Sequence, residues 1–111
     1  MDVPPEIAFR HVEPTAALKS ITHESIDSLE KVHPRLTSCR VMVEETSRGV
    51  PHIRLDIGVP GGDLVVNREA PDDPASRNLP SAVHDAFDVA RRQLREQHKR
   101  IVDGKRRGNS V

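Results

Sequence analysis

The sequence predicts an α+β fold with the element order β-α-β-β-β-α, in which two helices pack on one face of a four-stranded sheet. Four segments alternate apolar and polar residues, as half-buried strands do, and two longer segments repeat apolar residues at three- and four-residue steps, as one face of a helix requires. Hairpins with one polar face leave the other face for both helices. With 111 residues, the chain suits a single domain.

The first third of the chain predicts a strand followed by a helix. Residues 7–12 indicate a short strand with one apolar face. The helix is expected to begin at residues 13–15, where Pro14 lies in the first turn and needs no N–H. It should end at His33, because a residue that precedes proline avoids helical geometry. Its apolar stripe is narrow and consists of Leu18, Ile21, Ser25, Leu29 and Val32.

Three further strands are expected at residues 36–45, 50–59 and 64–67, each with period-two alternation. The turn before the last strand is Pro60-Gly61-Gly62, where proline sets the first corner and glycine supplies a positive φ. Residues 70–79 are rich in proline, aspartate, serine and asparagine and therefore predict an exposed loop.

The last helix has the clearest period. Pro80 and Ser81 suit its first turn, and Gly104 suits its end. We therefore expect an α/β domain at residues 1–103 and a basic, flexible tail at residues 104–111. The apolar positions of the helix lie in one wedge that contains Val83, Ala86, Phe87, Ala90, Leu94 and Ile101.

The charge of the chain is balanced overall but unevenly distributed. The chain holds 17 Lys and Arg residues and 17 Asp and Glu residues, yet residues 91–107 carry eight positive residues against two acidic ones, a net +6. Such clustering favours binding of a polyanion, although a solvated helix face followed by a frayed tail gives the same pattern. With no Trp, no Tyr and two Phe, the chain has almost nothing on which to stack bases. Nucleic acid would therefore be bound through charge and shape.

The candidate binding residues lie along one flank of the last helix. On a projection at about 100° per residue, this flank lies beside the apolar wedge and contains Arg91, Arg92, Arg95, His98 and Lys99. Like charges at i and i+4 repel one another, whereas a row of guanidinium groups can contact successive phosphates. Arg10, Arg40 and Arg54 add cations to the open face of the predicted sheet, where ordinary surface charge is an equally good explanation.

Other functions find little support in the sequence. No apolar run is long enough to span a membrane, and residues 1–5 lack the features of a secretory signal, so we expect a cytoplasmic protein. The chain has no phosphate-binding glycine loop, its six histidines have no metal-ligand spacing, and Cys39 is expected to be an inert core thiol. We therefore expect no enzyme activity, no catalytic residue, no metal or other cofactor and no small-molecule substrate.

Four segments resemble the bacterial ribosome hibernation promoting factors, also called ribosome-associated translation inhibitors or sigma-54 modulation proteins. These segments are residues 7–14, 36–41, 59–69 and 86–94, and the resemblance covers about residues 6 to 103. Its most specific parts are the Val-Pro-Gly-Gly-Asp-Leu sequence and the Arg-Arg-Gln-Leu sequence of the last helix. Because no long extension follows Val111, we expect a short-form member.

The resemblance implies a fold like that of double-stranded-RNA-binding domains and a site on the small ribosomal subunit. There, between head and body, the protein would exclude messenger and transfer RNA during stress or stationary phase. Family members contact ribosomal RNA through basic residues of the second helix, which correspond here to Arg91, Arg92, Arg95 and Lys99. Off the ribosome, we expect a monomer.

Two alternatives remain open at this point. A small module that regulates a protein partner, such as a transcription factor, would carry an exposed apolar patch. A general binder of RNA duplexes would show the same cations but no preference for ribosomes.

Overall fold

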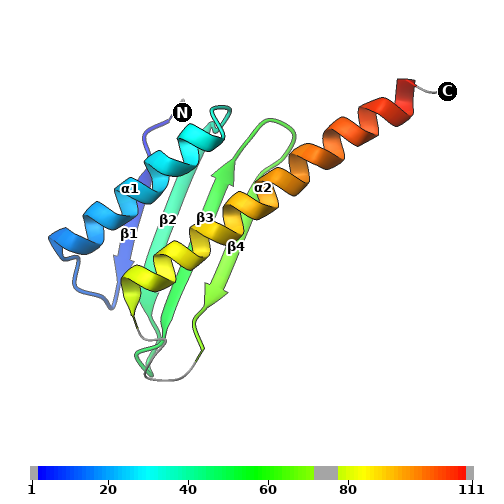
Figure 1. Cartoon of the computed structure of the whole chain (residues 1–111). Coiled ribbons are helices and arrows are strands. Elements are labelled where there is room, and N and C mark those ends of the chain that lie inside the picture. The colour runs from blue at the N-terminus through cyan, green and yellow to red at the C-terminus, as the bar shows by residue number, and fades with distance from the viewer. Residues whose placement is uncertain (1–2, 72–77, 110–111) are drawn as a thin grey trace.

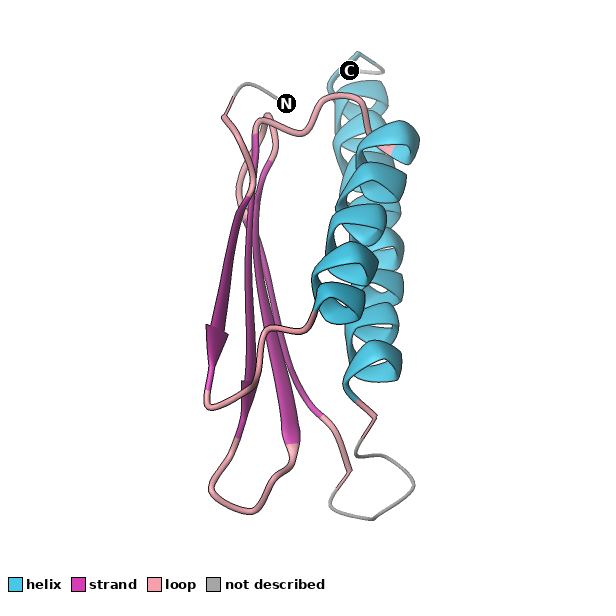
Figure 2. Ribbon diagram, turned by 90° about the vertical axis from the view of Figure 1, so that its left-hand side faces the viewer, coloured by secondary structure: helices cyan, strands magenta, loops and turns pink. Residues whose placement is uncertain are grey.

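The computed structural model describes residues 3–71 and 78–109, and after Gln97 it describes only the side chain of Lys99. It contains the predicted six elements in the predicted order. These are β1 (Glu6–Arg10), α1 (Ala16–Val32), β2 (Ser38–Glu45), β3 (Pro51–Gly58), β4 (Leu64–Glu69) and α2 (Leu79–Asn109). Both helices lie on one face of the sheet and leave the other face open, as Figures 1 and 2 show. The predicted fold class is confirmed.

The sheet has the spatial order β1-β2-β3-β4 and is mixed. β2, β3 and β4 form antiparallel hairpins, whereas β1 and β2 are parallel because the chain crosses over through α1 between them. The register places Arg10 beside Glu44 and Arg40 beside Asp56. It therefore decides which charges are neighbours on the open face.

The first strand is shorter than predicted, for a reason visible in its backbone. His11 has a φ of 56°, in the left-handed region that extended strands do not use. The strand therefore ends at Arg10 rather than at Val12. The fourth strand is longer than predicted. It was expected to end at Asn67, but its pairing with β3 continues to Glu69.

The helix α1 begins where Thr15 caps it, since the Thr15 hydroxyl accepts a hydrogen bond from the backbone N–H of Leu18 at 3.2 Å. The predicted stripe is partly wrong. Leu18, Ser25 and Leu29 are buried, but Val32 is 52% exposed, and Ile26 takes a buried place that the stripe did not include. Val32 is the last residue of α1, so the apolar period extends to a position that the fold does not bury.

One hydrophobic core joins the sheet to both helices. The inward residues of β2 and β3 alternate with exposed ones, and they pack against α2 around Phe87, which is 1% exposed. Five of the six residues of the predicted wedge are buried, and the side chain of the sixth, Ile101, lies outside the described residues. The burial of the wedge therefore fixes which side of α2 faces the sheet.

The helix α2 is longer than predicted. The prediction that Gly104 ends it is wrong, because α2 continues to Asn109 and projects beyond the sheet in Figure 1. A glycine inside a helix costs only about 1 kcal/mol relative to alanine, so a single glycine does not have to end the helix. The division into a domain at residues 1–103 and a basic, flexible tail at residues 104–111 stays a prediction.

Candidate nucleic-acid interface

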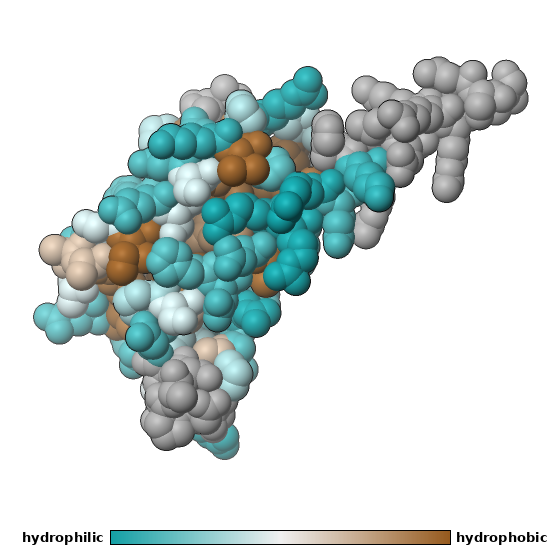
Figure 3. All heavy atoms as spheres, viewed as in Figure 1, coloured by the Kyte–Doolittle hydropathy of each residue, from teal (hydrophilic) through white to brown (hydrophobic). Residues whose placement is uncertain are grey.

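Four cations on α2 form what we call the cationic stripe, which consists of Arg91, Arg92, Arg95 and Lys99. The side chains of Arg92, Arg95 and Lys99 are exposed, whereas Arg91 is half-buried. Because Ala90 and Leu94 of the same turns face the core, the stripe points away from the sheet. Hydrophilic residues gather along α2 on this face in Figure 3. The side chain of His98, predicted on the same flank, lies outside the described residues.

Arg91 differs from the rest of the stripe because its guanidinium is already engaged. Its Nη1 donates to the hydroxyl of Ser28 in α1 at 3.3 Å, and its Nη2 forms an ion pair with Asp88 one turn earlier. Within the described part of the chain, no side chain forms a hydrogen bond or ion pair with Arg92, Arg95 or Lys99. These three cations are therefore available to an outside anion.

The predicted sheet cations lie on the opposite face and are not brought together with the stripe. Arg10, Arg40 and Arg54 are exposed, and along their strands they alternate with buried or half-buried residues that face the helices. Arg40 forms an ion pair with Glu6 at 2.9 Å between Nε and Oε2. Arg54 lies 3.3 Å from Asp56, measured from Nε to Oδ2.

A histidine links three strands on this open face. The Nδ1 atom of His52 lies 2.5 Å from Oε1 of Glu44 in β2, and its Nε2 atom contacts Oδ1 of Asn67 in β4. Partial burial lowers the pKa of His52, but the hydrogen bonds to Glu44 and Asn67 and the nearby carboxylate of Glu69 outweigh it and raise that pKa above 6.5. Sequence reasoning gave His52 no role beyond its place among six histidines without metal-ligand spacing. The antiparallel register of its hairpin was the signal that could have placed it beside Glu44.

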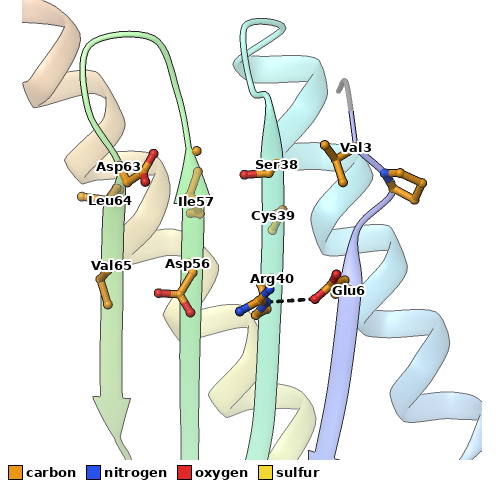
Figure 4. Close-up of a pocket in the computed structure, with 12 residues that line it drawn as sticks. Val3, Glu6, Ser38, Cys39, Arg40, Asp56, Ile57, Asp63, Leu64 and Val65 are labelled. Carbon is orange, nitrogen blue, oxygen red and sulfur yellow. Dashed lines mark hydrogen bonds and ion pairs between the residues drawn. The ribbon is translucent and has the colours of Figure 1, made fainter.

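A pocket of about 220 Å³ lies at one end of the open face, shown in Figure 4. Its charged side chains are Glu6, Arg40, Asp56 and Asp63, and the ion pair between Arg40 and Glu6 closes one side of it. The acidic residues outnumber the single cation, so the pocket does not suit a phosphate.

The chemistry of the remaining groups is unremarkable for binding. Burial, and then the negative charge of Asp56, raise the pKa of Cys39 to about 11, as expected for an unreactive core thiol.

The described residues contain no group of three histidine, cysteine or acidic side chains that could hold a metal ion. Nor do they contain a helix long and apolar enough to cross a membrane. Their exposed large hydrophobic residues are Val3, Val32 and Val65, which lie on different segments.

Solved structures of other proteins share this fold. A ribosomal subunit interface protein from Coxiella burnetii superposes with a TM-score of 0.72 at 12% identity, covering 86% of this chain and 97% of that one. The N-terminal domain of Protein Y from Thermus thermophilus superposes with a TM-score of 0.67 at 21% identity, covering 86% and 98%. At these identities the likeness establishes the fold alone.

Membership of a family rests on the sequence. The family described as sigma 54 modulation protein / S30EA ribosomal protein matches residues 6–102, which is nearly the whole chain. The chain belongs to this family, and the predicted resemblance is confirmed. A search of curated proteins found no significant match.

Proposed function

We propose that this protein binds the small ribosomal subunit through ribosomal RNA phosphates and blocks translation during stress or stationary phase. The observation that carries the proposal is the exposed, unpaired part of the cationic stripe, on a single helix of a chain that belongs to the S30EA family. By this proposal the protein is a cytoplasmic, monomeric hibernation factor and not an enzyme.

The stripe suits phosphates better than bases. Arg95 and Lys99 lie one helical turn apart, which is about 6 Å along the axis, so they can contact neighbouring phosphates on an RNA backbone. Base stacking would need exposed aromatic rings, but Phe87 is buried in the core and Phe9 is half-buried against it. Binding is therefore expected to follow the shape and charge of a folded RNA.

The mechanism needs no chemical step. A folded domain that is held by phosphate contacts in the channel of the small subunit occupies the volume that messenger and transfer RNA require. Arg10, Arg40 and Arg54 would add weaker contacts, because an RNA phosphate must compete with Glu6 for Arg40 and with Asp56 for Arg54.

A general binder of RNA duplexes is the second candidate, and the lack of exposed aromatic rings favours it as well. The two functions differ in their preference for ribosomes. The protein should co-sediment with purified small subunits in a sucrose gradient and remain bound in the presence of excess RNA hairpin competitor. It should also inhibit a cell-free translation reaction at concentrations that saturate the subunits. Displacement by the hairpin at equal phosphate concentration would favour the general binder and contradict the ribosomal function.

A further inference from the structure

We propose that Arg91 is a positioning residue, which fixes the stripe relative to α1, and that it is not itself a phosphate ligand. The inference rests on the proposed function and divides the stripe into two parts. Arg92, Arg95 and Lys99 would contact RNA, and Arg91 would hold the helix that carries them.

The first argument is that the Arg91 guanidinium already has two hydrogen-bond partners. Its two terminal nitrogens are used by Ser28 of α1 and by Asp88 of α2. The Arg91 side chain is 31% exposed, whereas that of Asp88 is 57% exposed. A phosphate that approached Arg91 would meet the exposed carboxylate of Asp88 beside it, and this repulsion offsets the attraction of the guanidinium.

The second argument is the position of this contact between the helices. Ser28 is half-buried and is followed by Leu29, which is fully buried, while Arg91 follows the buried residue Ala90. The hydrogen bond between Arg91 and Ser28 therefore lies directly above the core, along the seam where α1 and α2 pack. It joins α1 to α2 through one side chain of each helix.

The position of the contact determines how it would act on binding. The exposed cations Arg92 and Arg95 follow Arg91 within about one turn. If the contact with Ser28 fixes this turn, the cations are ordered before RNA arrives and less entropy is lost on binding. Arg91 would then raise affinity without adding a phosphate contact.

Salt dependence separates a positioning residue from a phosphate ligand. Each phosphate contact adds about 0.7 to 0.9 to the steepness with which log affinity falls with log salt. Three contacting cations predict a slope of roughly −2 to −3. Replacing a ligand makes the slope shallower, whereas replacing a positioning residue lowers affinity equally at every salt concentration.

The experiment measures the affinity of fluorescently labelled protein for purified small ribosomal subunits between low and moderate KCl concentrations. The variants are Ser28→Ala, Arg91→Gln, their combination, Arg95→Gln and the control Lys19→Gln, whose side chain is exposed near the other end of α1. We expect Ser28→Ala and Arg91→Gln each to weaken binding about two- to tenfold with the slope unchanged, and the pair to weaken it no further. Arg95→Gln should make the slope shallower by about 0.7 to 0.9.

Each contrary outcome has a distinct meaning. A shallower slope for Arg91→Gln would make Arg91 a phosphate ligand and overturn the inference. Unchanged affinity of Ser28→Ala and Arg91→Gln at 25 °C, with a lowered melting temperature, would make the contact structural only and overturn it too. Absence of binding by the wild-type protein would contradict the proposed function itself. The Arg91→Lys variant, which keeps the charge but not the planar fork, should recover only part of the affinity.

Discussion

On the open face of the sheet, Arg40 and Arg54 each lie beside a carboxylate, whereas on α2 three cations project with no acidic partner among the described residues. Arg40 pairs with Glu6 and Arg54 pairs with Asp56, and both pairs are exposed to solvent. The sequence alone places the cations of both faces among the candidate binding residues, with ordinary surface charge an equally good explanation for those on the sheet. The comparison teaches that a count of positive residues does not identify a binding surface, because each cation must also be free of an internal partner.

The largest expected effect is the loss of binding when the unpaired cations are reversed. The Arg92→Glu, Arg95→Glu double variant should bind small subunits at least about 100-fold more weakly near 100 mM salt, because two phosphate contacts are lost and two repulsions replace them. The fold should survive, since both side chains are exposed. Fluorescence anisotropy with labelled protein measures the affinity, and a thermal melt checks the fold. Binding that stays within threefold of wild type would place the RNA contact elsewhere.

Much of the fold could be predicted from the sequence, because the local spacing of apolar residues determines most of its helices and strands. Alternation in β2 and β3 identified their buried residues, and the wedge of α2 identified Val83, Phe87 and Leu94. The errors arose where local pattern and tertiary position disagree. Val32 continues the apolar period of α1 to its last residue but is exposed, and Gly104 is a stop signal too weak to end α2.

The candidate site was only partly predictable for the same reason. The helical period placed Arg92, Arg95 and Lys99 on an exposed flank, and the structure shows that these three side chains are exposed. The contact between Arg91 and Ser28 joins residues 63 positions apart, so no local pattern could indicate it. The pairing of His52 with Glu44 is harder to predict than a helical face but easier than the contact between Arg91 and Ser28, because a hairpin register can be inferred once the turn is located.

A smaller effect is expected from pH, and it should be confined to the open face. Because the pKa of His52 is raised in the folded state, its contribution to stability is fully present below the unfolded pKa of about 6.5 and is lost as pH rises through the folded pKa. The free energy of unfolding should therefore decline as the pH rises above about 6.5. Urea unfolding of the wild type and of His52→Gln, measured at pH 6 and pH 9, tests this expectation.

The control for the pH prediction is His84→Gln, since His84 is exposed on α2 and no described side chain pairs with it. The free energy of unfolding of His84→Gln should still decline as the pH rises, whereas that of His52→Gln should decline much less. Affinity for small subunits should be nearly the same in both variants at low pH. Equal flattening by the two variants would mean that the bridge between Glu44, His52 and Asn67 does not persist in solution.

The smallest effect is expected from neutralising the paired arginines. In the Arg40→Gln, Arg54→Gln double variant, affinity for small subunits should change by less than about threefold, because each lost cation was already balanced by a carboxylate. Stability should change by less than about 1 kcal/mol for each pair, as is usual for exposed ion pairs. The salt slope of binding should become shallower by less than the roughly 0.7 expected for one full phosphate contact, since these paired arginines would add only weak contacts. A tenfold loss of affinity with a slope shallower by about 1.4 to 1.8 would instead mean that both arginines leave their carboxylates for RNA phosphates, and that the ribosome is bound by both faces of the molecule.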